Sequence, residues 1–283
     1  MFRFITFLIS KSPKVSFLSL LFLYSFSAKA QTLTSKQIWD TLDVIDYNAG
    51  ITGTQKLELF YSWEKKMYSL KKPADSVLAK VFNKIGKYES IVSNDYEKAI
   101  FYTHKAFAIN NSRTKGASKL YAIYGALNLG YYYDAINDFN NAIIYNDSCV
   151  FLAEKFHDCE YEIMDARLVN SYIYFRIGNY EKCISESTIG LHTAKIISDS
   201  IYIMKLLNQR SQALMSYEKL SESQLDIMQG LLIAEKKKYE TELKIKKEKI
   251  KNTGILKKLL QALSQLSYQV ATAYKTRAYI FKY

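Results

Sequence analysis

Proline and glycine are scarce in this chain, whose 283 residues include only 2 Pro and 10 Gly. Sandwiches and barrels need a turn every few residues, and these two residue types form turns most readily, so their scarcity favours long helices over short strands. The composition is 49% hydrophobic and 23% charged, which is typical of an ordered chain with a substantial core. The sequence therefore predicts an all-α fold.

Cysteine is also rare, and the number of cysteines is odd: Cys149, Cys159 and Cys183. An odd number does not suit a disulfide framework. A disulfide between Cys149 and Cys159 is possible only if the helix that carries Cys149 ends before Cys159. On one continuous helix the two would lie about 15 Å apart, too far for a bridge.

The residue patterns of common catalytic and metal sites are absent. The three histidines, His104, His157 and His192, show no metal-ligand spacing. The chain has no GxSxG motif, phosphate-binding loop, Rossmann glycine set or Cys-x-x-Cys pair. We therefore expect that the protein is not an enzyme and uses no cofactor or metal.

The first thirty residues have the pattern of a secretory signal peptide. Lys11 and Lys14 precede the apolar run "VSFLSLLFLYSF", and "SAKA" follows it just before Gln31. A retained membrane anchor is the alternative, but Lys11, Pro13 and Lys14 interrupt the apolar region before it reaches the roughly 20 residues of a span. The sequence predicts cleavage near Ala30, export to the periplasm or beyond, and no membrane span in the mature chain.

The chain is basic, with a formal net charge of +12 that falls to +8 without the four basic residues of 1–30. Much of this excess lies in residues 235–258, "EKKKYETELKIKKEKIKNTGILKK", which contain no arginine and only one aromatic residue. Nucleic-acid surfaces typically use arginine and stacking aromatic residues. We interpret this segment as a solvated helix and expect no nucleic-acid partner.

A short phrase recurs along the chain, as "SNDYEKAIFYT" at 93–103, "NLGYYYDAINDF" at 128–139 and "RIGNYEKCISES" at 176–187. Alignment on Tyr96, Tyr132 and Tyr180 brings small residues together at two later positions. These are Ala99, Ala135 and Cys183 at the first, and Ala106, Ala142 and Gly190 at the second. Small residues seven apart form a stripe on which a neighbouring helix can lie. An apolar segment of helical period precedes the second and third phrases, so each unit is predicted as helix, turn, helix.

The repeated unit resembles the tetratricopeptide repeat. The match is closest in "MDARLVNSYIYFRIGNYEKCISESTIGL", where Ser171 and Tyr174 take the small and aromatic positions of the first helix and Gly178 takes the turn. A degenerate unit follows at "MKLLNQRSQALMSYEKLSESQLDIMQGLL", with small residues at Ser211, Ser223 and Gly230 and Leu220 in place of the aromatic. The resemblance covers about residues 75–283. It implies a right-handed α-α superhelix, a tetratricopeptide-like solenoid.

The pattern departs from the family norm in two ways. The aligned tyrosines are 36 and 48 residues apart, and the proline that usually ends each unit is missing. We therefore expect extended second helices, one of which turns at His157–Asp158. The predicted organisation is a signal peptide (1–30), an N-terminal helical hairpin that caps the stack and ends at Pro73 (31–74), repeats (75–234), a Lys-rich helical extension (235–254) and a partial repeat (255–283).

The predicted binding groove is the inner face of each first helix, which in the tetratricopeptide family holds extended peptides or a partner's helix. Most of the 24 tyrosines are better explained as packing residues. The residues left on that face are Tyr124, Asn128, Tyr172, Arg176, Asn208 and Gln212. Amide and guanidinium groups can bind a peptide backbone or carboxylate. The alternative is that these are ordinary surface residues without a ligand.

The sequence thus favours an exported helical-repeat interaction module whose partner is a protein or peptide. The alternative is the extracytoplasmic sensor part of a tetratricopeptide-type signalling or transcriptional regulator, whose membrane span and output domain would lie outside this chain. The end of the sequence bears on both hypotheses. Its last residues include Tyr279, Ile280, Phe281 and Tyr283, which are too apolar for a capping helix.

Overall fold

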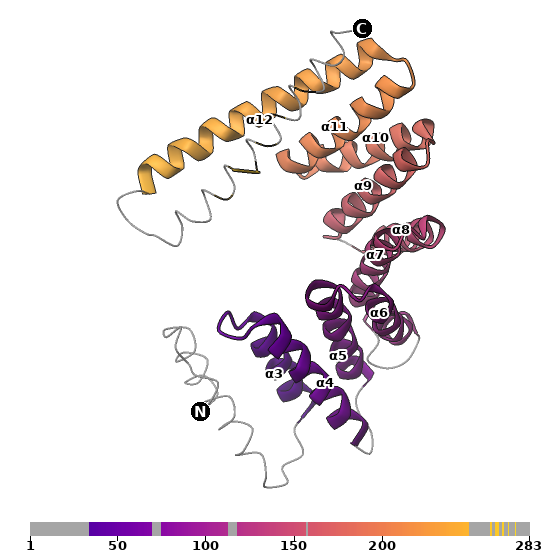
Figure 1. Ribbon diagram of the computed structural model, residues 1–283, viewed down its shortest axis with the longest axis vertical. Coiled ribbons are helices and arrows are strands. Elements are labelled where there is room, and N and C mark those ends of the chain that lie inside the picture. The colour runs from indigo at the N-terminus through magenta and orange to yellow at the C-terminus, as the bar shows by residue number, and fades with distance from the viewer. Residues whose placement is uncertain are drawn as a thin grey trace. The chain divides into compact units, whose positions relative to one another are not determined.

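The computed structural model describes residues 34–69, 75–112, 118–156 and 158–248, with six isolated positions between 261 and 275. All regular elements of this described part are helices (Figure 1). The prediction of an all-α fold is therefore confirmed. The predicted signal peptide, the Pro73 loop, His157 and nearly all of the predicted partial repeat at 255–283 lie outside the described residues.

The chain divides into two compact units, Met1–Asp138 and Phe139–Tyr283, and each is described by itself. The helices of the first unit are α3 (Ser35–Tyr47), α4 (Gly53–Ser69), α5 (Asp75–Tyr88), the π-helix η2 (Glu89–Ser93), α6 (Tyr96–Asn111) and α7 (Lys119–Ala135). Those of the second unit are α8 (Phe139–Ala153), α9 (Glu160–Arg176), α10 (Tyr180–Ile196), α11 (Ser200–Ser216) and α12 (Leu220–Glu248). Within each unit most helices pack against the next in the chain, so the contacts are largely local.

The N-terminal region, formed by α3, α4 and α5, is held by large apolar side chains. Its core includes Leu42, Phe60, Met67, Val81 and Ile85, all almost fully buried. The chain enters this region through a capping box: the Thr34 hydroxyl accepts from the Gln37 amide N–H, and the Gln37 side chain accepts from the Thr34 N–H.

A buried ion network links the same three helices. The Asp46 carboxylate on α3 accepts from Lys84 Nζ at 2.5 Å, Lys87 Nζ at 3.1 Å and the Tyr88 hydroxyl at 2.8 Å, all from α5. Lys56 Nζ on α4 donates to the Asp46 backbone carbonyl at 2.6 Å. Desolvation by itself would raise the pKa of Asp46, but the hydrogen bonds and charges of its partners outweigh it and lower the pKa to about 2.

The turns between helices share one backbone device. In each turn one residue has a positive φ. The next helix begins within the two residues that follow it, and in most of these turns the first of those residues is the N-cap. The residues with positive φ are Asn94, Asn137, Asp158, Gly178, Ser198 and Glu218, and Asp158 belongs to the turn predicted at His157–Asp158. In three of these turns the following side chain accepts from the first turn of the next helix: Asp95 from the Lys98 N–H, Asn179 from the Lys182 N–H, and Asp199 from the Ile201 N–H. These turns explain how long helices alternate with so little proline.

The second helices of the repeats begin at Tyr96, Phe139, Tyr180 and Leu220, which are 43, 41 and 40 residues apart. Tyr132 instead lies inside α7, so the predicted alignment on Tyr132 was wrong by seven residues. Ala135, placed by that alignment in a packing position, is exposed. Seven residues are about two helical turns, so a shift of seven leaves the small residues on the same face of the helix. Ala142 therefore falls in a small-residue position whether the phrase is aligned on Tyr132 or on Phe139.

The stripe of small residues on the second helices is confirmed as a packing surface. On α10 it consists of Cys183, Ser187, Gly190 and Ala194, all buried. A side chain at Gly190 would meet its neighbours, because a Cβ there would lie 3.0 Å from Leu206 Cδ2 and 3.4 Å from Arg167 Cβ. Ala142 and Cys149 occupy the corresponding positions on α8 and are also fully buried.

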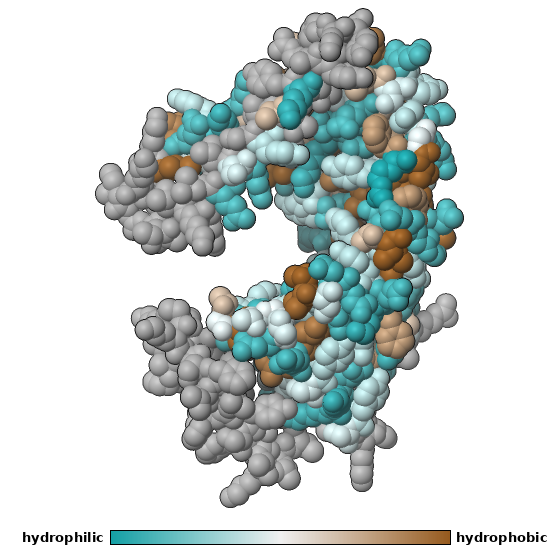
Figure 2. All heavy atoms as spheres, viewed as in Figure 1, coloured by the Kyte–Doolittle hydropathy of each residue, from teal (hydrophilic) through white to brown (hydrophobic). Residues whose placement is uncertain are grey.

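The helix α12 runs without interruption from Leu220 to Glu248, so the Lys-rich segment that begins at 235 continues the second helix of the last described repeat. No helix within the described residues is both long and apolar enough to cross a membrane. On the surface, hydrophobic side chains form separate patches among hydrophilic ones (Figure 2).

Candidate functional site

The first helices α7, α9 and α11 each present a narrow stripe of residues to solvent. On α7, in the first unit, the stripe includes Tyr124, whose side chain is 37% exposed, and the half-buried Asn128 one turn later. The Tyr124 ring meets the edge of Tyr121 at 6.1 Å, and Tyr121 meets Trp39 at 5.4 Å. Aromatic contacts therefore position Tyr124 against the N-terminal region.

On α9, in the second unit, Tyr172 and Arg176 are both exposed and lie one turn apart. The Arg176 guanidinium carbon stands 4.5 Å from the centre of the Phe139 ring. Arg176 is also the last residue of α9, where a cation interacts favourably with the helix dipole. These contacts orient the guanidinium at the end of the helix and leave it at the surface. Burial of part of the side chain raises the pKa of the Tyr172 hydroxyl.

On α11 the corresponding residues are Asn208 and Gln212, both half-buried. The adjacent Gln209 is buried, and its Nε2 donates to the Ser171 backbone carbonyl on α9 at 3.4 Å. This bond joins the two helices directly behind their exposed stripes. The structure thus brings Tyr172, Arg176, Asn208 and Gln212 onto neighbouring helices, whereas Tyr124 and Asn128 belong to the other unit.

The opposite end of the α9–α11 surface carries polar groups that sequence reasoning missed. The Tyr202 hydroxyl on α11 donates to Asp165 on α9. The Tyr161 ring meets the Tyr202 ring at 6.4 Å, and Lys205 Nζ lies 4.9 Å from the centre of the same ring. A helical count back from Tyr172 through Asp165 to Tyr161 could have found the α9 members of this group, since all three share one face.

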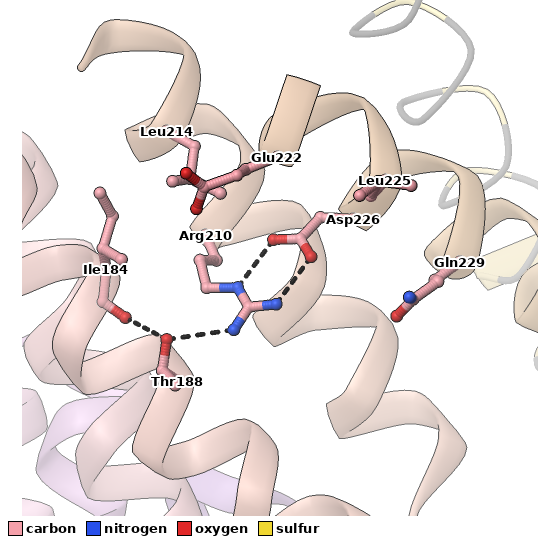
Figure 3. A pocket seen from close by; sticks show the side chains of 8 residues that line it. All are labelled: Ile184, Thr188, Arg210, Leu214, Glu222, Leu225, Asp226 and Gln229. Atoms are coloured by element: carbon pink, nitrogen blue, oxygen red, sulfur yellow. Dashed lines mark hydrogen bonds and ion pairs between the residues drawn. The ribbon is translucent and has the colours of Figure 1, made fainter. Parts of the chain in front are cut away.

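A shallow pocket of about 270 Å³ lies on the other side of α11, between α10, α11 and α12 (Figure 3). Arg210 is one of its lining residues, and the guanidinium donates to the Asp226 carboxylate through two hydrogen bonds of 2.7 Å and to the Thr188 hydroxyl at 3.1 Å. Arg210 and Asn208 are two residues apart, hence about 200° apart around the helix. Since Arg210 already has partners on both neighbouring helices, we assign it a structural role.

The described residues contain no group of three or more His, Cys, Asp or Glu arranged to hold a metal ion. Cys149, Cys159 and Cys183 are free and buried, so the bridge left open between Cys149 and Cys159 is not present. Burial raises the pKa of the Cys149 thiol to about 12 and also raises that of the other two thiols. All three therefore stay protonated at neutral pH and are poor nucleophiles.

Sequence comparison and structure comparison give different answers for this chain. No protein-family model matches the sequence, and no curated protein is detectably similar to it in sequence. Among solved structures, the apo form of RapI is similar with a TM-score of 0.61 and 12% identity, over 89% of this chain and all of RapI. The likeness is thus in the fold.

Two further solved structures are similar over most of this chain. Aspartyl phosphate phosphatase F from Bacillus subtilis matches with a TM-score of 0.56 and 13% identity, over 87% of this chain and 65% of the phosphatase. The Rap conjugation gene regulator of plasmid pLS20, solved in complex with the Phr* peptide, matches with a TM-score of 0.50 and 14% identity, over 90% of this chain and 79% of the regulator. The helix order, the buried small-residue stripes and these similarities show that the chain has a tetratricopeptide-like helical-repeat fold.

Proposed function

We propose that this protein is an interaction module that binds an extended peptide, or an exposed segment of a protein, on the adjacent stripes of α9 and α11. The observation that carries the proposal is the juxtaposition of Tyr172 and Arg176 with Asn208 and Gln212 on neighbouring helices joined by Gln209. The opposite faces of these helices pack within the unit, and these four side chains are exposed or half-buried, so a ligand can reach them. The regulator solved with the Phr* peptide supports a peptide as the ligand class.

The chemistry of these side chains suits a peptide. Each amide can donate to a backbone carbonyl and accept from a backbone N–H. The exposed guanidinium of Arg176 can bind a carboxylate through two hydrogen bonds, either from an acidic side chain or from a C-terminus. The proposal includes no catalytic step, no cofactor and no nucleic acid.

The test uses a pool of random-sequence decapeptides with free C-terminal carboxylates, passed over the immobilised protein, with bound peptides identified by mass spectrometry. We expect retained sequences to bind Arg176→Ala about 1.5–3 kcal/mol more weakly in calorimetry, the range for hydrogen bonds to a charged group. The same peptides made with C-terminal amides show whether the carboxylate is terminal.

Lys155→Ala is the matched control, because Lys155 is also an exposed cation in the second unit and lies 3.5 Å from the centre of the Phe151 ring. This variant removes the same charge and the same kind of ring contact from the turn that follows α8. Unchanged affinity in Arg176→Ala, or an equal loss in Lys155→Ala, would refute the proposed surface.

We also propose that the protein is exported, as the leader-like pattern of residues 1–30 predicts. N-terminal sequencing of the native protein from the cell envelope should find Gln31 as the first residue. Recovery of intact Met1 from the cytosol would contradict export.

A sensor role is the second candidate, favoured by the similarity to a structure described as a conjugation gene regulator. In that case the bound peptide would be a signal. A strain that carries Arg176→Ala should then show the same altered transcript profile as a strain that lacks the protein. A wild-type profile in both strains would leave the interaction module without a signalling role.

A further inference from the structure

The end of the α9–α11 surface opposite Arg176 carries a carboxylate that no cation neutralises. Within the part of the chain that the structure describes, Asp165 on α9 accepts from the Tyr202 hydroxyl on α11 and forms no ion pair. Lys205 Nζ lies over the Tyr202 ring, 4.9 Å from its centre, and not on the carboxylate. Asp165 is half-buried, so a charged group of a ligand can reach it.

Tyrosine rings border this carboxylate. The Tyr161 side chain is 52% exposed and lies on the same face of α9 as Asp165, one turn before it. The centre of its ring is 6.4 Å from that of the Tyr202 ring. The faces of such rings attract cations, as the contact of Lys205 with Tyr202 shows within the chain itself. A carboxylate beside tyrosine rings therefore suits an ammonium or a guanidinium group and disfavours an anion.

The charged residues of α9 have opposite signs at its two ends. Glu160 and Glu162 lie in the first turn and Asp165 follows them, whereas Arg176 is the last residue. The other cation of α9, Arg167, is paired with a glutamate of α10 at 3.0 Å. The helix dipole favours this order of charges and can account for it without a ligand. It does not account for the face of the helix on which Asp165 and Arg176 lie.

Asp165 and Arg176 share one face of α9 and lie at the two ends of the candidate surface. Eleven residues make about three turns, so the two positions differ by only about 20° around the helix, with Tyr172 between them. Along the axis they are about 16 Å apart at 1.5 Å per residue. An extended chain rises about 3.3 Å per residue, so about five residues of a peptide cover this distance. The half-buried amides of Asn208 and Gln212 on α11 lie beside the same stretch.

On the basis of the peptide-binding function given above, we propose that the α9–α11 surface selects peptides with two opposite charges about five residues apart. Arg176 binds the carboxylate, and Asp165 binds the cation between the rings of Tyr161 and Tyr202. The cation is a lysine or arginine side chain or an N-terminal ammonium, which can all donate to a carboxylate. Asp165 thereby determines specificity, because it repels peptides that carry acidic groups alone.

The test uses pools of octapeptides with acetylated and amidated ends, so that only side chains carry charge. One pool has lysine at position 2 and glutamate at position 7, and the others have norleucine for the lysine, glutamine for the glutamate, or the two charges at positions 4 and 6. We expect the wild-type protein to retain the first pool about tenfold better than any other. In calorimetry Asp165→Asn, which still accepts from Tyr202, should weaken retained lysine peptides about tenfold and leave their norleucine versions unchanged.

Glu160→Gln is the matched control. It removes the same charge from the same end of α9, but Glu160 lies five residues before Asp165 and thus about 140° away around the helix. A further pool with free N-termini and no basic side chain distinguishes the two sources of the cation. Retention of this pool would assign the site to an ammonium of either origin, and its loss together with retention of the lysine pool would assign the site to basic side chains.

Three results would overturn the proposal. One is an equal loss of affinity for lysine and norleucine peptides in Asp165→Asn, which would give Asp165 a purely structural role. Another is an equal effect of Glu160→Gln. The third is a set of retained peptides that Arg176→Ala weakens and Asp165→Asn does not, in which case the peptide-binding function stands without the cation site. Failure of that function itself looks different, because Arg176→Ala would then have no effect either.

Discussion

The N-terminal region and the repeats of the second unit pack their helices by different means. In α3, α4 and α5 the core consists of large side chains such as Phe60 and Met67, and a buried ion network around Asp46 crosses it. In α9, α10 and α11 large side chains such as Leu206 and Leu207 are buried too, but a stripe of small residues on α10, Cys183 and Gly190 among them, lets the helices come close. Large side chains fill a space between helices, whereas small ones let the helices approach closely, so the two regions should fail under opposite changes.

Removal of side-chain volume should harm the N-terminal region most. We expect Phe60→Ala to lower the free energy of unfolding by about 3–5 kcal/mol, because Phe60 is fully buried and its loss leaves a large cavity. Cys183→Ala, the same kind of change in a repeat, should cost about 1 kcal/mol or less, since it removes a single sulfur atom.

Tryptophan fluorescence during urea unfolding reports the first of these changes. The chain has two tryptophans, and both, Trp39 and Trp63, lie in α3 and α4. A fluorescence transition that Phe60→Ala leaves in place would show that the region does not depend on its large side chains.

Addition of volume should harm the repeats. We expect Cys183→Leu to cost about 1–3 kcal/mol, since the larger side chain forces α9, α10 and α11 apart. Circular dichroism, which reports all helices, follows this change. Ala135→Leu is the control, because Ala135 is exposed although the repeated phrase predicted it in the same position as Cys183. If both variants lost the same free energy of unfolding, Ala135 would be a packing position like Cys183, and the alignment on Tyr132 would be correct.

Acid should weaken the N-terminal region through Asp46. The pKa of this carboxyl group is lowered from 3.8 to about 2 in the folded state, so it stabilises the fold above the unfolded-state value. This stabilisation, about 2 kcal/mol, should disappear as the pH falls from about 4 towards 2. The difference in unfolding free energy between wild type and Asp46→Asn, measured by fluorescence, should shrink over that range. A constant difference would mean that Asp46 titrates normally.

Arg176→Ala should have the smallest effect on stability, under about 1 kcal/mol. Arg176 is exposed, and an exposed contact of a cation with an aromatic ring, such as its contact with Phe139, contributes about 0.5–1 kcal/mol. Thermal melts followed by circular dichroism measure this directly. A larger loss would make Arg176 a packing residue and remove the basis for its use as a binding probe.

The sequence predicted the kind of repeat correctly but placed one repeat in the wrong register. The small residues at Cys183, Gly190 and Ala142 were correctly assigned to buried positions, because a stripe of small residues is a direct signature of close helix contact. The placement of Tyr132 was wrong, because a shift of seven residues preserves the helical face and so leaves the pattern almost unchanged. The turn at Asn137, with its positive φ, distinguishes the two registers.

Only part of the candidate site could be predicted from the sequence. Helical spacing was enough to place Tyr172 with Arg176, and Asn208 with Gln212, on solvent-facing stripes of α9 and α11. It was not enough to find Asp165 and Tyr202, because their hydrogen bond joins residues 37 positions apart in the chain. Whether a ligand binds there stays a prediction.

The sequence by itself determined the helical class, the small-residue stripes and the faces of the first helices, because each depends on spacing within one helix. The tertiary structure decided which helix ends where, which polar groups meet, and which apolar residues stay exposed. Asp46 among its lysines, Arg210 between Thr188 and Asp226, and Asp165 beside Tyr202 all depend on contacts between helices. Such contacts join residues distant in the chain, and local periodicity carries no information about them.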